Sequence, residues 1–171
     1  ESYSGASNVL TPGILWEAVP HSKAVLDFWD RVKEETGIRG GFQDAWGFGD
    51  NPRLTDELLG LVLEGKKRTT TTLVKEMEIE GYPEPKEGEY SVILDGSGEP
   101  RAVIRTASVR RARFSDVDEE HAYWEGEDYQ TLESYKREHT KYYRRRGEAL
   151  GFTFSEDMEV ILERFELVYP P

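Results

Sequence analysis

The chain has 171 residues, of which 37% are hydrophobic and 12% aromatic, enough apolar material for one globular domain and too much for disorder throughout. It has no cysteine, which excludes disulfides and thiolate metal sites and suits a reducing compartment, so we expect a cytoplasmic protein. The net charge of −12 argues against broad adhesion to nucleic acid, so any contact with a polyanion is expected to be local.

Residues 1–20 are predicted to form an irregular arm, partly docked on the core, because they are rich in Ser, Gly and Pro. They show no basic stretch followed by an apolar run, and no later segment approaches the roughly 20 apolar residues of a membrane span, so we expect no export signal and no membrane partner. A helix is predicted from Ser22 to about Glu35, with Gly37 as its stop. Its apolar residues recur at helical spacing at Val25, Phe28, Trp29 and Val32.

Residues 40–50 contain too much glycine for a helix, and we expect a loop that packs on the core or lines a pocket. Asn51 and Pro52 begin a second predicted helix that ends at Gly65, with an apolar stripe of Leu54, Leu58, Leu61 and Val62. The β-branched residues after Arg68 predict a strand through Val74.

The rest of the chain mixes strands and helices in no regular alternation. A hairpin turn is predicted at residues 96–99, a helix stop at Gly126, and a bulge at Glu163–Arg164, where the apolar alternation changes phase. This order predicts a mixed sheet or a small barrel. The predicted elements are strands at Tyr90–Asp95 and Arg101–Phe114, a short helix from Ser115 to Glu125, a longer helix from about Thr131 to Arg146, and a final strand at 158–169.

The segment from Gly65 to Leu73 places Lys66, Lys67 and Arg68 beside four threonines, at the junction of the second helix and the following strand. One interpretation is a helix cap followed by an ordinary strand with solvated lysines. The other is that Lys67 activates a threonine hydroxyl as a base, its pKa lowered by burial and by its cationic neighbours. The pattern alone leaves both open.

Glu125 is expected at the last turn of its short helix, where a carboxylate faces the negative end of the helix dipole. It is either a surface glutamate or a residue held there by a partner such as Lys67. His121 lies four residues earlier on the same helix face, but the sequence shows no third ligand for a metal, and His139 fits a packing role. We expect no metal and no cofactor.

The basic residues gather in clusters, although the chain is acidic overall. If two clusters share a face, they form a positive groove for phosphates, with Tyr123, Trp124 or Tyr142 available for base stacking. Alternatively, the helical cations pair with nearby carboxylates. The clusters are Lys66, Lys67 and Arg68; Arg101, Arg105, Arg110, Arg111 and Arg113; and Lys136, Arg137, Lys141, Arg144, Arg145 and Arg146.

Gly65, Lys67 and Thr70 fit the pattern Gly-x-Lys-x-x-Thr-x-Arg, with Thr72 in place of the final Arg. Together with the Phe48-Gly49-Asp50 and Glu119-Glu120-His121-Ala122 runs, this motif resembles the ASCH domain family over roughly residues 42–169, in a branch that lacks the terminal Arg. The resemblance implies an α+β fold, a PUA-like mixed β-barrel with peripheral helices, and association with RNA. Residues 1–40 would be an added N-terminal arm and helix packed on the domain, and residues 41–171 the ASCH domain.

The resemblance implies a catalytic triad of Lys67, Thr70 and Glu125, as in family members that hydrolyse N4-acetylcytidine. Thr70 would attack the acyl carbonyl, Lys67 would take its proton, and Glu125 would orient the lysine or the base. In a regular strand Lys67 and Thr70 point to opposite faces, so the chain must bend at Arg68 for them to meet.

A second member type is a metal-independent ribonuclease of single-stranded RNA, in which Lys67 would stabilise charge at the phosphate. A non-catalytic RNA-binding module and a sensor of a small nucleotide are further alternatives. The candidate residues for binding RNA or a modified nucleoside are Lys66, Arg68, Thr72, Arg105, Arg110, Trp124, Arg144 and Arg145.

Overall fold

The computed structural model describes residues 2–4 and 21–171, and it is built around one mixed sheet with the strand order β1-β2-β4-β5-β6-β3. The β2–β4 pair is parallel and the other pairs are antiparallel. The end strands β1 and β3 approach each other, so the sheet curls toward a closed barrel. The strands are β1 (Ser2–Ser4), β2 (Asp44–Phe48), β3 (Thr69–Leu73), β4 (Tyr90–Leu94), β5 (Pro100–Arg113) and β6 (Glu159–Tyr169).

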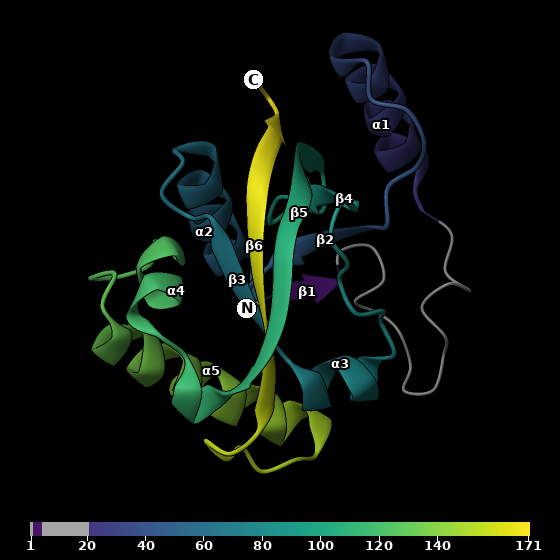
Figure 1. Cartoon of the computed structure of the whole chain (residues 1–171). Helices are drawn as coiled ribbons and strands as arrows, with labels where there is room; N and C mark the ends of the chain where they lie inside the picture. Colours follow the sequence, from purple (N-terminus) through teal and green to yellow (C-terminus); the bar gives the residue numbers. More distant parts are fainter. Residues whose placement is uncertain (1, 5–20) are drawn as a thin grey trace.

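The helices surround this sheet, with the long β5–β6 pair running through the centre of the molecule (Figure 1). One helix, α5, crosses one end of the sheet beside α4, whereas α1 lies at the opposite end (Figure 1). The α+β fold with a mixed sheet is therefore as the sequence predicts. The helices are α1 (Lys23–Thr36), α2 (Pro52–Leu63), α3 (Val74–Glu80), α4 (Glu119–Trp124) and α5 (Leu132–Leu150).

Side-chain caps explain where the helices begin. The Ser22 hydroxyl accepts a hydrogen bond from the Val25 N–H, and Asn51 caps α2 in the same way. At the other end of α1, Gly37 adopts a positive φ of 77°, which ends the helix as predicted. The predicted apolar face of α1 is buried, and it packs with residues of β2, β4 and β5, namely Ala45, Val92, Leu94 and Val103.

Several sequence predictions differ from the structure. The helix predicted from Ser115 to Glu125 is divided into a 3-10 turn at Phe114–Asp116 and α4, because the Asp118 side chain caps a new helix start. Residues 44–48 form the fully buried strand β2, so the loop prediction for 40–50 is wrong there. The strand predicted through Val74 ends at Leu73, and α3 follows at once. The register shift near the predicted bulge lies opposite Phe165 and Arg164, but the additional residue is in β5, between Thr106 and Ser108. Ser2–Ser4 pairs with β2 instead of being irregular, whereas residues 1 and 5–20 of the predicted arm lie outside the described residues.

Among the described residues, no helix combines the length and apolar character that a bilayer crossing requires.

Candidate functional site

Lys67 lies in the turn between α2 and β3, two residues after Gly65, whose φ is 81°. Its side chain is fully buried, with 0% exposed. The Nζ donates hydrogen bonds to Glu125 Oε1, to the Thr69 carbonyl oxygen at 2.9 Å and to Glu127 Oε2 at 3.2 Å. The Glu125 carbonyl oxygen, 3.4 Å from Nζ, is a further, weaker acceptor. Each of the three ammonium protons therefore has an acceptor within reach, which is how a buried cation is tolerated here.

Of the two interpretations of Glu125, the structure shows the ion pair with Lys67. The interpretation in which cationic neighbours lower the pKa of Lys67 does not fit the surroundings of its side chain. Lys66 is exposed and lies 3.5 Å from Glu64, and the Arg68 Nε donates to the Gly65 carbonyl oxygen at 3.3 Å. Within the described part of the chain, Lys67 forms ion pairs with the carboxylates of Glu125 and Glu127.

Glu125 is brought to Lys67 by a close approach of two backbone segments. The Arg68 N–H donates to the Trp124 carbonyl oxygen at 2.6 Å, which ties the end of α4 to the turn before β3. Gly126 follows with a φ of 74°, and a Cβ on it would lie 2.5 Å from the Lys66 carbonyl oxygen and 2.9 Å from the Lys67 nitrogen. Only glycine leaves room for this contact.

The second oxygen of Glu125 is held by Thr71, which donates a hydrogen bond to Oε2 at 2.7 Å. Thr71 Oγ1 also lies 2.9 Å from His121 Nε2 and 2.7 Å from the Tyr135 hydroxyl. Because a hydroxyl has one proton and an ionised carboxylate can only accept, Thr71 accepts hydrogen bonds from His121 and Tyr135. The Glu125 carboxylate is thus fixed on both oxygens.

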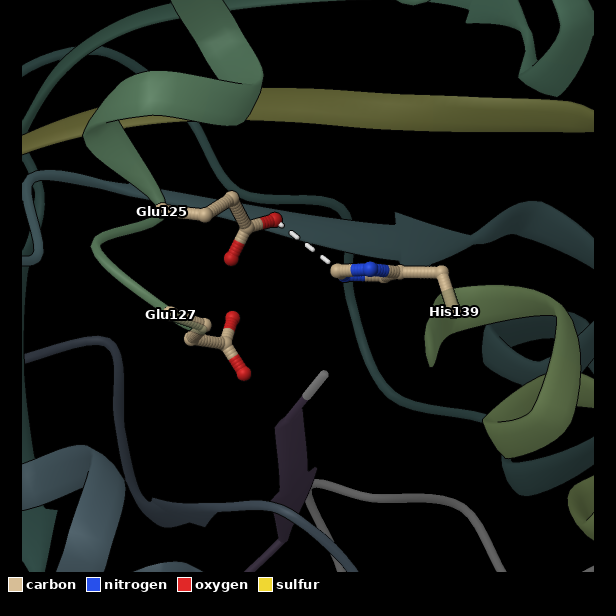
Figure 2. Close-up of side chains that lie close together, drawn as sticks. All are labelled: Glu125, Glu127 and His139. Atoms are coloured by element: carbon tan, nitrogen blue, oxygen red, sulfur yellow. Dashed lines mark ion pairs between the residues drawn. The ribbon is translucent and has the colours of Figure 1, made fainter. Parts of the chain in front are cut away.

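Glu125, Glu127 and His139 converge from the end of α4, the loop after it and α5 (Figure 2). His139 Nδ1 faces the Tyr135 carbonyl oxygen at 2.9 Å, and its Nε2 is turned toward Glu125 Oε2 at 3.4 Å. The ligand atoms of these three residues lie within 4.8 Å of one another, a set that could hold a metal ion. However, the Lys67 ammonium already bonds both carboxylates, so a divalent ion would have to displace it.

The charge of this cluster follows from its contacts. Burial alone would raise the pKa of Glu125, but the Lys67 charge, with help from His139 and His121, holds that pKa well below its ordinary value. Burial lowers the pKa of His121, despite the opposing effect of Glu125. At neutral pH the cluster therefore contains an ionised Glu125 and a neutral His121.

A pocket of about 420 Å³ opens beside Glu125, between α2 and α5. Buried Tyr135, Tyr142 and His139 supply ring surfaces, and Leu54, Leu58 and Leu61 of α2 supply an apolar wall. The volume falls within the range of pockets that take small organic ligands.

The Thr70 hydroxyl forms no hydrogen bond with Lys67 or Glu125. Thr69 and Thr71 bond α4 from one face of β3, so Thr70 and Thr72 point to the other face, toward the interior of the curled sheet. Thr70 is 1% exposed, and its hydroxyl has no hydrogen-bond partner among the described residues. Thr72 is buried on the same face.

The predicted binding residues do not form one groove of free cations. Lys66, Arg105, Arg110 and Arg145 each lie near a carboxylate, and Arg145 bonds Asp50 at 2.6 and 3.0 Å. Three other α5 cations behave similarly, since Arg137, Lys141 and Arg146 pair with glutamates or Asp128. This is the pairing alternative that the sequence left open.

Two predicted binding residues remain available on the surface. Arg144 is exposed and forms no ion pair within the described part of the chain. Trp124 is half-buried, with the Arg164 guanidinium 5.5 Å from its ring centroid. Near it, Arg110 and Arg164 line a hollow of about 220 Å³ together with Asp118 and Glu120.

Sequence reasoning missed Thr71, Glu127, Tyr135 and His139 as members of this cluster. Thr71 could not be told from its threonine neighbours, because only the strand phase decides which hydroxyl faces Glu125. Tyr135 and His139 are four residues apart on one helix face, and their rings stack with centroids 3.9 Å apart. The sequence shows this four-residue spacing, but ordinary core packing would also explain it.

The ASCH domain family model matches residues 44–169 of the chain. The fold is similar to that of protein EF3133 from Enterococcus faecalis V583, with 30% identity, a TM-score of 0.77, and coverage of 86% of this chain and 91% of that one. It is also similar to an ASCH domain from Lactobacillus crispatus JV V101, with 25% identity, a TM-score of 0.76, and coverage of 91% and 99%. The sequence matches none of the curated proteins. These similarities confirm the expected PUA-like fold.

Proposed function

The chain belongs to the ASCH domain family, whose members are generally associated with RNA, and we propose that it is a hydrolase of a modified nucleoside or of single-stranded RNA that needs no metal. The observation that carries this proposal is the fully buried Lys67–Glu125 pair beside a pocket of ligand size. Buried charges held by several hydrogen bonds at a concave site are typical of catalytic centres.

Thr70 is the nucleophile in this proposal, as the family motif implies. Because its side chain faces the interior of the curled sheet and does not line the pocket, the acyl group of a bound nucleoside must extend beyond the pocket to reach it. Lys67 acts as an electrostatic stabiliser rather than as the base, because its ammonium is surrounded by acceptors that favour its protonated form, and only an amine that has lost a proton can act as a base. Glu125 holds the ammonium in place, since one of its oxygens bonds Lys67 and the other bonds Thr71.

The charge around the pocket favours a nucleoside over an RNA strand. Carboxylates outnumber cations among the residues that line the pocket, so a phosphate backbone would be repelled there, whereas an uncharged base could stack on the tyrosines. The charged lining residues are Glu57, Glu125, Glu127, Asp128 and Glu138 against Lys141 and Arg145.

The test is incubation of the purified protein, with a chelator present, with N4-acetylcytidine and separately with labelled single-stranded RNA. Lys67→Met keeps the approximate length of the side chain without its charge, and Lys75→Met, at an exposed position of α3, is a matched control. We expect cytidine release that falls on the order of 100-fold or more in Lys67→Met and is unchanged in Lys75→Met. Loss of release together with loss of fold, seen by circular dichroism, would be assigned to stability instead.

A non-catalytic RNA-binding module is the second candidate, supported by the Arg110 and Arg164 hollow beside Trp124. It predicts no turnover of either substrate, but retention of RNA that weakens with salt and with Arg164→Ala. That result would exclude the hydrolase for these substrates.

A further inference from the structure

A polar seam crosses the inner face of the sheet at Thr70 of β3, Glu163 of β6 and Thr106 of β5. All three side chains are buried, with 1%, 4% and 2% exposed. Apolar clusters flank the seam on both sides, since Phe165 packs with Phe48 and Ile161 packs with Val74. Polar side chains between two apolar clusters lower stability unless their hydrogen bonds are satisfied, so a buried polar group without a partner points to a functional role.

Strand pairing places Thr70 and Glu163 side by side. They are direct partners in the antiparallel β3–β6 register, so their side chains project to the same face with Cβ atoms about 5 Å apart. On the far side of Glu163, the Thr106 hydroxyl donates a hydrogen bond to Glu163 Oε2 at 2.7 Å. The bulge after Thr106 shifts the register of β5 at this point, which lets Thr106 reach a carboxylate that is not its direct partner.

The Thr70 hydroxyl is the one member of the seam with no hydrogen-bond partner within the described residues. A buried hydroxyl without a hydrogen-bond partner is unfavourable. Its partner is therefore either a bound substrate or a nearby acceptor that the hydroxyl reaches by rotating. The Glu163 carboxylate is the neighbouring acceptor across the strand pair.

We propose that Glu163 is the proton acceptor for the Thr70 hydroxyl, with Thr106 positioning its carboxylate. This inference rests on the proposed function, in which Thr70 is the nucleophile and Lys67 only stabilises charge. As the Thr70 Oγ bonds to the acyl carbon, its proton passes to Glu163. Glu163 then gives that proton to the departing amine nitrogen as the C–N bond breaks. In the second half, water attacks the acyl-Thr70 ester, Glu163 accepts the water proton, and the proton returns to Thr70 Oγ as the acid leaves.

The electrostatic setting suits this role. Burial raises the pKa of Glu163 to about 7, against a lowering by the Thr106 hydrogen bond, so both proton states are populated near neutral pH. Among the described residues, the charged neighbours are Glu89 before β4, which raises the pKa, and Lys67 before β3, which lowers it. A base with a pKa near the working pH combines a large ionised fraction with useful basicity.

The experiment uses p-nitrophenyl acetate as a general acyl donor, with acetylation of Thr70 followed by mass spectrometry from pH 5 to 9, beside the nucleoside and RNA assays. In the wild type we expect Thr70 to be acetylated with a midpoint near pH 7, as the pKa of Glu163 requires. Glu163→Gln should slow acetylation on the order of 100-fold and remove that midpoint. Thr106→Val should move the midpoint upward, because the carboxylate loses a donor. Glu166→Gln, on the exposed face of the same strand, should change neither.

The outcomes separate this inference from the proposed function. Turnover that requires Lys67 but is equal in Glu163→Gln would overturn the inference and leave the hydrolase intact. Acetylation of Thr70 that requires Glu163, without turnover of either substrate, would support the inference and show that the substrates were wrongly chosen. Absence of Thr70 acetylation in the wild-type protein at every pH would overturn the inference as well.

Discussion

Gly126→Ala tests whether the close contact between the end of α4 and the turn before β3 holds the site together. A Cβ at this position would lie 2.5 Å from the Lys66 carbonyl oxygen, so the two backbone segments must move apart. The φ of 74° adds a left-handed conformation that alanine disfavours by about 1–2 kcal/mol. Forced repacking of the contact adds about 1–3 kcal/mol, for a total of about 2–5 kcal/mol.

Gly98→Ala is the matched control, because Gly98 has a similar φ of 80° but nothing lies within 4 Å of its added Cβ. It should lose only the conformational part, about 1–2 kcal/mol. The comparison is made by urea unfolding followed by tryptophan fluorescence, and by thermal unfolding, where each kcal/mol lowers Tm by about 2–4 °C in a domain of this size. Equal losses in the two variants would refute the argument that the contact, rather than the backbone angle, requires glycine at 126.

Three further predictions concern the buried polar groups. Lys67→Met should cost about 3–5 kcal/mol in urea unfolding by leaving Glu125 buried without its cation, and adding Glu125→Gln should recover part of that loss; additive losses would contradict the pairing. Thr71→Val should cost about 1–3 kcal/mol while Thr71→Ser stays near wild type, and equal effects would mean that the hydroxyl is not needed. Because burial raises the pKa of Glu163 from 4.5 to about 7, the folded chain holds a proton that the unfolded chain has released, so stability should fall by up to about 3 kcal/mol as the pH rises through this range. Glu163→Gln should flatten that dependence, and an unchanged slope would contradict it.

Local signals predicted the helix ends well, because caps act over three or four residues. Ser22 and Asn51 cap their helices, and Gly37 and Gly126 adopt the left-handed conformation expected of a stop. The helix predicted to Arg146 continues through Gly147 to Leu150, and it ends where Gly151 adopts a positive φ of 84°.

The missed elements depend on tertiary contacts. Residues 44–48 form a strand because they pair with both β1 and β4, and their glycine obscured this. The start of α3 shows no side-chain cap, so the β-branched run before it extended the predicted strand. In both places contacts within the fold override the local preference of the sequence.

For the site as well, local signals were predictive and tertiary contacts were not. The motif indicated Lys67 and Glu125, which lie far apart in sequence and meet in the structure. Spacing could not reveal that the amine would be surrounded by carboxylates, nor that Thr70 would face Glu163, because both depend on the register of β3 against β6 and the place of α4. The sequence therefore indicated Glu163 only through the change of phase in the apolar alternation of the last strand.

The hydrogen bond from Lys67 to the Thr69 carbonyl also affects how the molecule meets other chains. Among the described strands, β3 ends the sheet order and pairs with β6 alone, so the carbonyl oxygens of Thr69 and Thr71 face outward along an edge strand. Lys67 Nζ covers the first of them, and the Tyr143 hydroxyl reaches the second at 3.5 Å. A foreign strand could not hydrogen-bond to these carbonyls without displacing both side chains. The same lysine that holds the glutamates thus protects this edge from strand addition and aggregation.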